Sequence, residues 1–111
     1  MPDIVIVYTT WPDAGKAEAV GSDAVARRLA ACINVFAPIR SVYRWQGRME
    51  SAEETPMTLK TTRATAPALR DFLAQQHPYE TPCILAWDAA ADLSHAPFLA
   101  WVEDQVTTPP H

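Results

Sequence analysis

Residues 33–62, "INVFAPIRSVYRWQGRMESAEETPMTLKTT", decide the fold, because they predict two long strands joined by a short turn. The first strand alternates, and one of its faces carries Ile39, Ser41, Tyr43 and Trp45. The dipeptide Gln46–Gly47 is typical of a hairpin turn. The returning strand contains Pro56, which has no N–H for a ladder hydrogen bond, so it marks an edge, a bulge or a break.

The length of this hairpin is unusual for so small a protein. As one strand, residues 33–46 would span roughly 45 Å, whereas a chain of 111 residues has a radius of gyration of about 13 Å. The hairpin must therefore bend, break near Pro38 and Pro56, or project from the body. A projecting hairpin exposes an apolar ribbon that includes Val42, Tyr43, Trp45 and Met49. We expect other copies of the chain to cover it.

The segments on both sides of the hairpin complete a regular pattern. A strand at 3–10 precedes a helix at 11–32, whose apolar stripe comprises Val20, Ala24, Val25, Leu29 and Cys32. After the hairpin come a helix at 65–76, a strand at 82–88 and a helix at 94–106. We expect the inward side chains of these two helices to be Leu69, Phe72 and Leu73, then Phe98, Trp101 and Val102.

The order β-α-β-β-α-β plus a C-terminal helix predicts an α+β fold, a ferredoxin-like sandwich with two helices on one face of an antiparallel sheet. We expect one domain at 1–106 and a flexible tail at 107–111, because the tail is short and proline-rich.

Composition excludes several classes of partner. Nine basic against thirteen acidic residues give a net charge of −4, which argues against a nucleic-acid or anionic-membrane surface. No apolar run approaches the ~20 residues of a membrane span, and the N-terminus is typical of a strand rather than a signal peptide. We therefore expect a cytoplasmic protein. Cys32 and Cys83 lie in no CxxC or Cys/His cluster, which predicts reduced, unpaired and buried thiols.

The stretch "QQHPYETP", residues 75–82, is the most unusual short segment. Its prolines restrict the backbone around an imidazole, a phenol and a carboxylate. Two interpretations stay open. The loop is a rigid corner between a helix and a strand, or it is a binding-site wall with His77 and Glu80 facing a cleft and Lys60 reaching Glu80.

Other chemistry has little support. His77, His95 and His111 are scattered, so no metal centre is predicted from ligand spacing within one chain. Three glycines supply no phosphate-binding loop, and there is no GxSxG motif. An acylphosphatase-like enzyme on this fold would need an arginine in the loop after the first strand to bind phosphate. The only cation in that loop is Lys16. We therefore expect no enzymatic activity.

Taken together, "RRLAACIN", "SVYRWQGRMESAEE", "LKTT" and "HPYETP" resemble the CutA (CutA1) divalent-cation tolerance family in order and spacing. The resemblance covers the chain from the first strand to the last helix. It implies a ferredoxin-like protomer in a tight homotrimer, similar in architecture to the PII signalling proteins, with the hairpin lying across neighbouring subunits. It also implies a link to divalent-metal tolerance and copper binding, with no established enzymatic activity.

The same resemblance assigns candidate site residues. The family's loop histidine falls on His77, as a metal ligand. The ligand-binding positions fall on Tyr43, Trp45, Glu50, Glu54, Lys60, Tyr79 and Glu80.

Two further positions affect the expected affinity for copper. Thr9 and Gln76 stand where some members carry a cysteine and a histidine, so the two softest copper ligands are absent. A copper or zinc site at His77 would therefore be weak. The alternative is a PII-like sensor of a small anionic metabolite held by Lys60 and loop amides.

Overall fold

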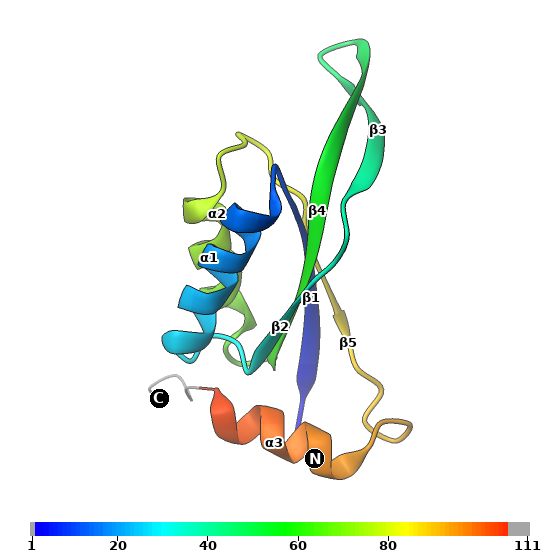
Figure 1. The fold of residues 1–111 in the computed structure, drawn as a ribbon. Coiled ribbons are helices and arrows are strands. Elements are labelled where there is room, and N and C mark those ends of the chain that lie inside the picture. Colours follow the sequence, from blue (N-terminus) through cyan, green and yellow to red (C-terminus); the bar gives the residue numbers. More distant parts are fainter. Residues whose placement is uncertain (1, 107–111) are drawn as a thin grey trace.

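The computed structural model describes residues 2–106 (Figure 1). The elements are β1 (Ile4–Trp11), α1 (Ala14–Ala26), β2 (Cys32–Val35), β3 (Ile39–Trp45), β4 (Arg48–Thr62), α2 (Ala66–Gln76), β5 (Ile84–Asp88) and α3 (Ala96–Gln105). This order is the predicted one, except that the first strand of the hairpin is divided in two. The prediction for the tail at 107–111 lies outside the described residues.

The strands form one antiparallel sheet in the order β2-β4-β1-β5, with β3 pairing further along β4. Helices α1 and α2 cover one face, as Figure 1 shows. The main core lies between them and the sheet, and it includes Val7, Trp11, Leu59, Leu69 and Leu73. The predicted ferredoxin-like sandwich is therefore confirmed.

The hairpin both breaks and projects. β2 ends at Val35 opposite Met57, and β3 begins at Ile39 opposite Glu54. Pro56 faces the gap between them, where its missing N–H costs no ladder bond, and its carbonyl accepts a hydrogen bond from the Phe36 N–H at 2.9 Å. β3 and the first half of β4 extend beyond the helices (Figure 1) and give overall dimensions of 45 × 28 × 23 Å.

The hairpin tip confirms the predicted turn. Gln46 and Gly47 have φ angles of 51° and 79°, and two central residues with positive φ match the right-handed twist of the flanking strands. Next to the tip, Val42 is 62% exposed and Met49 is 67% exposed, so the hairpin carries uncovered apolar side chains in a single protomer.

The first helix is shorter than predicted. It ends at Ala26, and Arg28 takes a left-handed conformation with φ 61°. The Leu29 N–H then donates to the Ala24 carbonyl and the Arg28 N–H to the Val25 carbonyl, the hydrogen bonds of a Schellman helix end. Arg28 stands where glycine is usual, and its guanidinium donates to the Asp104 and Gln105 carbonyls at the end of α3.

This ending corrects the predicted apolar stripe. Val20 and Ala24 are buried as expected, but Val25 is exposed and Cys32 belongs to β2. Gly21 is also buried. A Cβ there would lie 2.4 Å from Ile33 Cδ1, so this glycine allows α1 to approach the sheet closely.

The other two helices differ in how well they were predicted. In α2 the buried residues are Leu69, Phe72 and Leu73, as expected. In α3 the prediction was wrong for Phe98 and Trp101, which are 42% and 43% exposed. The buried side of α3 carries Leu99 and Val102, which form a second cluster with Ile4 at the end of the sheet.

The face of the sheet opposite α1 and α2 stays largely open. On β5, Leu85 is 59% exposed and Trp87 is 48% exposed, and both pair with residues of β1. The strands β2, β3 and β5 each pair with one neighbour only, so each leaves one backbone edge without a strand partner within residues 2–106. Cys32 and Cys83 are unpaired, as predicted, although both are only half-buried.

Candidate functional site

A pocket of ≈ 620 Å³ lies between β3 of the hairpin and the 79–83 loop. Its size falls in the range of small-molecule sites. The lining residues come from β1, β3, β4 and the loop, and they are Tyr8, Thr10, Ile39, Ser41, Tyr43, Trp45, Glu54, Tyr79, Glu80, Thr81 and Cys83. Five of the seven predicted ligand-binding residues are among them, namely Tyr43, Trp45, Glu54, Tyr79 and Glu80.

The alternation of β3 builds one wall. Ile39, Ser41, Tyr43 and Trp45 all line the pocket, as expected for one strand face. Glu54 pairs with Ile39 across the hairpin, and directly paired residues share a face, so its carboxylate joins the same wall. Glu54 lies on the part of β4 next to the break in the partner strand.

Glu54 is the charged group most enclosed by the pocket, at 8% exposed. Its side chain makes no hydrogen bond or ion pair with any of residues 2–106, and the pocket lining contains no lysine, arginine or histidine. Burial raises the pKa of Tyr8 and of Tyr79, and the negative charge of Glu54 raises both further. The pocket is therefore aromatic and anionic.

Burial and the charge of Glu54 also act on the thiol of Cys83. Burial raises the pKa of its thiol above the ordinary value of 9.0, and the Glu54 charge adds to this, whereas a hydrogen bond with Thr10 acts in the opposite direction. The thiol therefore stays protonated to higher pH than an exposed cysteine.

We expect Cys83 to be alkylated slowly at about pH 8, because only the thiolate reacts and a raised pKa reduces its population. The measurement is the iodoacetamide labelling rate of Cys83 in a Cys32→Ser background, against an unstructured peptide thiol. Glu54→Gln should increase the rate, since it removes the repulsion that opposes ionisation. A parent rate equal to that of the peptide would contradict the raised pKa.

His77 lies behind the pocket and anchors its loop. It is 7% exposed, and its Nε2 donates to the Thr10 carbonyl at 2.7 Å. Its Nδ1 accepts from the Tyr79 N–H at 3.2 Å, and its ring stacks on Trp11 with centroids 4.3 Å apart. Both nitrogens are therefore engaged, which fixes the neutral tautomer with the proton on Nε2.

This geometry corrects one expectation. Glu80 lines the pocket as predicted, but His77 does not face it, because the imidazole points into the fold toward β1. A metal at His77 would have to displace one of its two hydrogen bonds. Thr9 is also enclosed, since its hydroxyl accepts from Trp11 Nε1 at 2.7 Å and donates to the Met57 carbonyl at 3.1 Å.

Besides His77, two predicted site residues lie outside the pocket, namely Glu50 and Lys60. Glu50 pairs with Tyr43 and shares its face, but it is exposed and does not line the pocket. Lys60 does not reach Glu80 as predicted, because it lies far along β4 and its Nζ donates to Asn34 Oδ1 at 2.6 Å. Gln76 is exposed at the end of α2.

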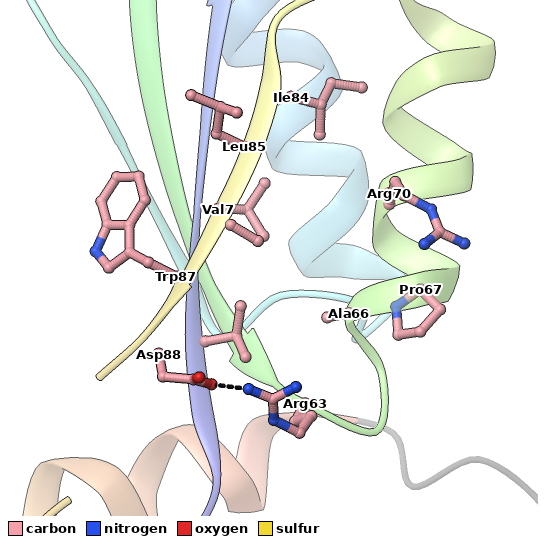
Figure 2. Close-up of a pocket in the computed structure, with 11 residues that line it drawn as sticks. Val7, Arg63, Ala66, Pro67, Arg70, Ile84, Leu85, Trp87 and Asp88 are labelled. Atoms are coloured by element: carbon pink, nitrogen blue, oxygen red, sulfur yellow. Dashed lines mark hydrogen bonds and ion pairs between the residues drawn. The ribbon is translucent and has the colours of Figure 1, made fainter. Parts of the chain in front are cut away.

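A smaller hollow of ≈ 240 Å³ lies between α2 and β5 (Figure 2). Arg63 and Arg70 border it, but Arg63 forms ion pairs with Asp88 and Asp3, and Arg70 pairs with Asp71. Both cations are thus already neutralised. Figure 2 also shows Leu85 and Trp87 on the opposite side of β5 from Ile84. None of the predicted site residues lies in this hollow.

Two features of residues 2–106 bear on metals and membranes. No three His, Cys, Asp or Glu side chains gather where they would hold a metal ion. Over the same described range, no helix has the length and apolar character needed to cross a bilayer.

Fold and pocket together define a ferredoxin-like α+β protein with a ligand-sized pocket beside a projecting hairpin. The family model for the CutA1 divalent ion tolerance protein matches residues 5–105, so the chain belongs to this family. It is 37% identical over 100 residues to Protein CutA of Homo sapiens, covering 90% of this chain and 54% of that one. It thus spans about half the length of the human relative.

Other relatives match along nearly their full length. The chain is 36% identical over 100 residues to the divalent-cation tolerance protein CutA of Archaeoglobus fulgidus, covering 90% of this chain and 95% of that one. Among solved structures, CutA1 from Shewanella sp. SIB1 superposes with a TM-score of 0.90 at 29% identity, covering 96% of this chain and 98% of that one.

Proposed function

We propose that this chain is a non-enzymatic, homotrimeric, PII-like binding protein whose ligand site is the pocket between β3 and the 79–83 loop. The observation that carries the proposal is the convergence of five predicted ligand-binding residues on one pocket. The ligand is a divalent metal, weakly held, or a small molecule. A cytoplasmic location stays a prediction.

Self-association is supported by the apolar surface of the protomer. Leu85 and Trp87 lie on an uncovered sheet face, and the projecting hairpin carries Val42 and Met49. Exposed apolar side chains next to unpaired strand edges favour contact with other subunits. In the proposed trimer, the hairpin of one subunit meets the β5 edge of the next. Because these are two different surfaces, the contact is heterologous, and three such contacts close into a ring.

A small molecule is better supported than a metal within one subunit. The pocket is large, and its nearby donors do not amount to a metal centre in residues 2–106. A copper or zinc site would need ligands from a second subunit, which is possible because the pocket lies beside the projecting hairpin.

The two alternative functions have less support. An anion sensor would use Lys60, which is outside the pocket and bonded to Asn34. An acylphosphatase-like enzyme would bind phosphate at the start of α1. There Asp13 caps the helix, its Oδ1 accepting from the Lys16 N–H at 2.8 Å, and this adds a negative charge.

We expect Trp87→Asp to convert the trimer into monomers at micromolar protomer concentration, because a buried, unpaired carboxylate at each contact is costly. The parent should stay trimeric down to nanomolar concentration. Sedimentation velocity over this range is the measurement. Leu93→Asp is the control, since Leu93 is 84% exposed in the loop before α3 and should leave the trimer intact. A monomeric parent at micromolar concentration would refute the proposed trimer.

A further inference from the structure

We infer that the pocket binds an organic cation, with an ammonium or quaternary ammonium group seated against Glu54 between aromatic walls. The inference rests on the proposed use of this pocket as a ligand site and names the chemical class of the ligand. It differs from the divalent metal of the family name in charge, size and mode of recognition.

The first argument is the state of Glu54. The residue is 8% exposed and lines the pocket, and its side chain has no hydrogen bond or ion pair within residues 2–106, so its carboxylate oxygens are open to the pocket. A carboxylate that faces a pocket without a protein partner is free to pair with a cation that enters, and a charge-assisted contact there is strong. Glu80, exposed at the rim, adds a second negative charge on the same side.

The second argument is the nature of the walls. The aromatic side chains that line the pocket are Tyr8, Tyr43, Trp45 and Tyr79. Aromatic faces attract cations, and cages of aromatic rings are the usual recognition of quaternary ammonium groups. They would contribute little to a hydrated metal ion, which prefers several oxygen, nitrogen or sulfur ligands.

The third argument excludes an anion. No lysine, arginine or histidine of residues 2–106 lines the pocket, and Lys60, the cation predicted to hold an anion, is bonded to Asn34. Burial first, and then the charge of Glu54, raise the pKa values of Tyr8, Tyr79 and Cys83, so the pocket disfavours added negative charge. A bound cation should lower these same pKa values.

The test uses choline chloride as the probe and the trimeric parent protein. Isothermal titration should detect choline binding, whereas 3,3-dimethyl-1-butanol, the uncharged carbon isostere, and 3,3-dimethylbutanoate, an anion of similar shape, should not bind measurably. In the Cys32→Ser background, saturating choline should also increase the alkylation rate of Cys83.

Three variants locate the interaction. Glu54→Gln keeps the side-chain shape and should weaken choline binding at least about tenfold, since a charged partner is lost. Trp45→Leu should weaken it about threefold, through loss of the ring face. Glu53→Gln is the matched control, because Glu53 pairs with Arg40 on the opposite face of the hairpin, lies outside the pocket and should change nothing.

Several outcomes would overturn the inference. They are no choline binding by the parent, equal binding of the carbon isostere, tighter binding of the anion, or unchanged affinity in Glu54→Gln. If Glu54→Gln dissociates the trimer and choline does not bind, the carboxylate is a subunit contact. A trimeric parent that binds copper or zinc but not choline would refute this inference and leave the proposed function standing.

Discussion

Replacing Trp11 by alanine should lower the free energy of unfolding by about 3–5 kcal/mol, the usual cost of removing a buried aromatic ring. Trp11 is fully buried at the end of β1, where it bonds Thr9 and stacks on His77. Typical domains are stable by only about 5–15 kcal/mol. The variant should therefore be close to unfolding at physiological temperature. Urea denaturation at a fixed protomer concentration measures the loss, since dissociation contributes to it.

Two controls separate packing from hydrogen bonding. Trp11→Phe keeps most of the ring volume and loses the bond from Nε1 to the Thr9 hydroxyl, so it should cost about 1–2 kcal/mol. Trp101→Ala makes the same deletion at a residue that is 43% exposed on α3, and it should cost less than Trp11→Ala. Equal losses at Trp11 and Trp101 would show that Trp11 has no special part in the core.

His77→Ala should lower the free energy of unfolding by about 3 kcal/mol. The truncation leaves a cavity beside Trp11, and it leaves the Thr10 carbonyl and the Tyr79 N–H without their partner. Because Tyr79 lines the pocket, ligand binding there should weaken as well. Thermal unfolding and titration of the same variant measure the two effects.

The same variant tests the prediction that His77 is a metal ligand. If the imidazole serves mainly as a ligand, His77→Ala should lose copper or zinc binding with little change in stability. If it serves mainly as an anchor, stability should fall first. His95→Ala is the control, since His95 is exposed and makes no capping hydrogen bond at the start of α3. Unchanged stability in His77→Ala would contradict the anchoring role.

Features encoded by neighbouring residues were predictable from the sequence. The alternation that places Tyr43 and Trp45 on one face is local, and so is the turn at Gln46–Gly47. The length of the strands then required a break or a projection, and the structure has both. These features gave the fold and one wall of the pocket.

Features that depend on distant pairing were not predictable in the same way. Tyr8 and Cys83 reach the pocket through the packing of β1 and the segment before β5, which no short pattern encodes. The inward turn of His77 depends on a carbonyl at Thr10, 67 residues away. The early end of α1 depends on Arg28, whose left-handed conformation lacks the usual glycine signal.

Because β3 both lines the pocket and projects from its subunit, ligand binding and assembly are connected. The strand presents Tyr43 and Trp45 to the pocket while it extends beyond the body of its own subunit. In the proposed trimer, occupancy of the pocket and the equilibrium between monomer and trimer are then linked functions. A ligand that binds the trimer more tightly than the monomer must tighten assembly by the same coupling free energy per bound molecule, because such coupling is reciprocal. Dilution, which dissociates the trimer, would thus release ligand, and bound ligand would oppose dissociation on dilution.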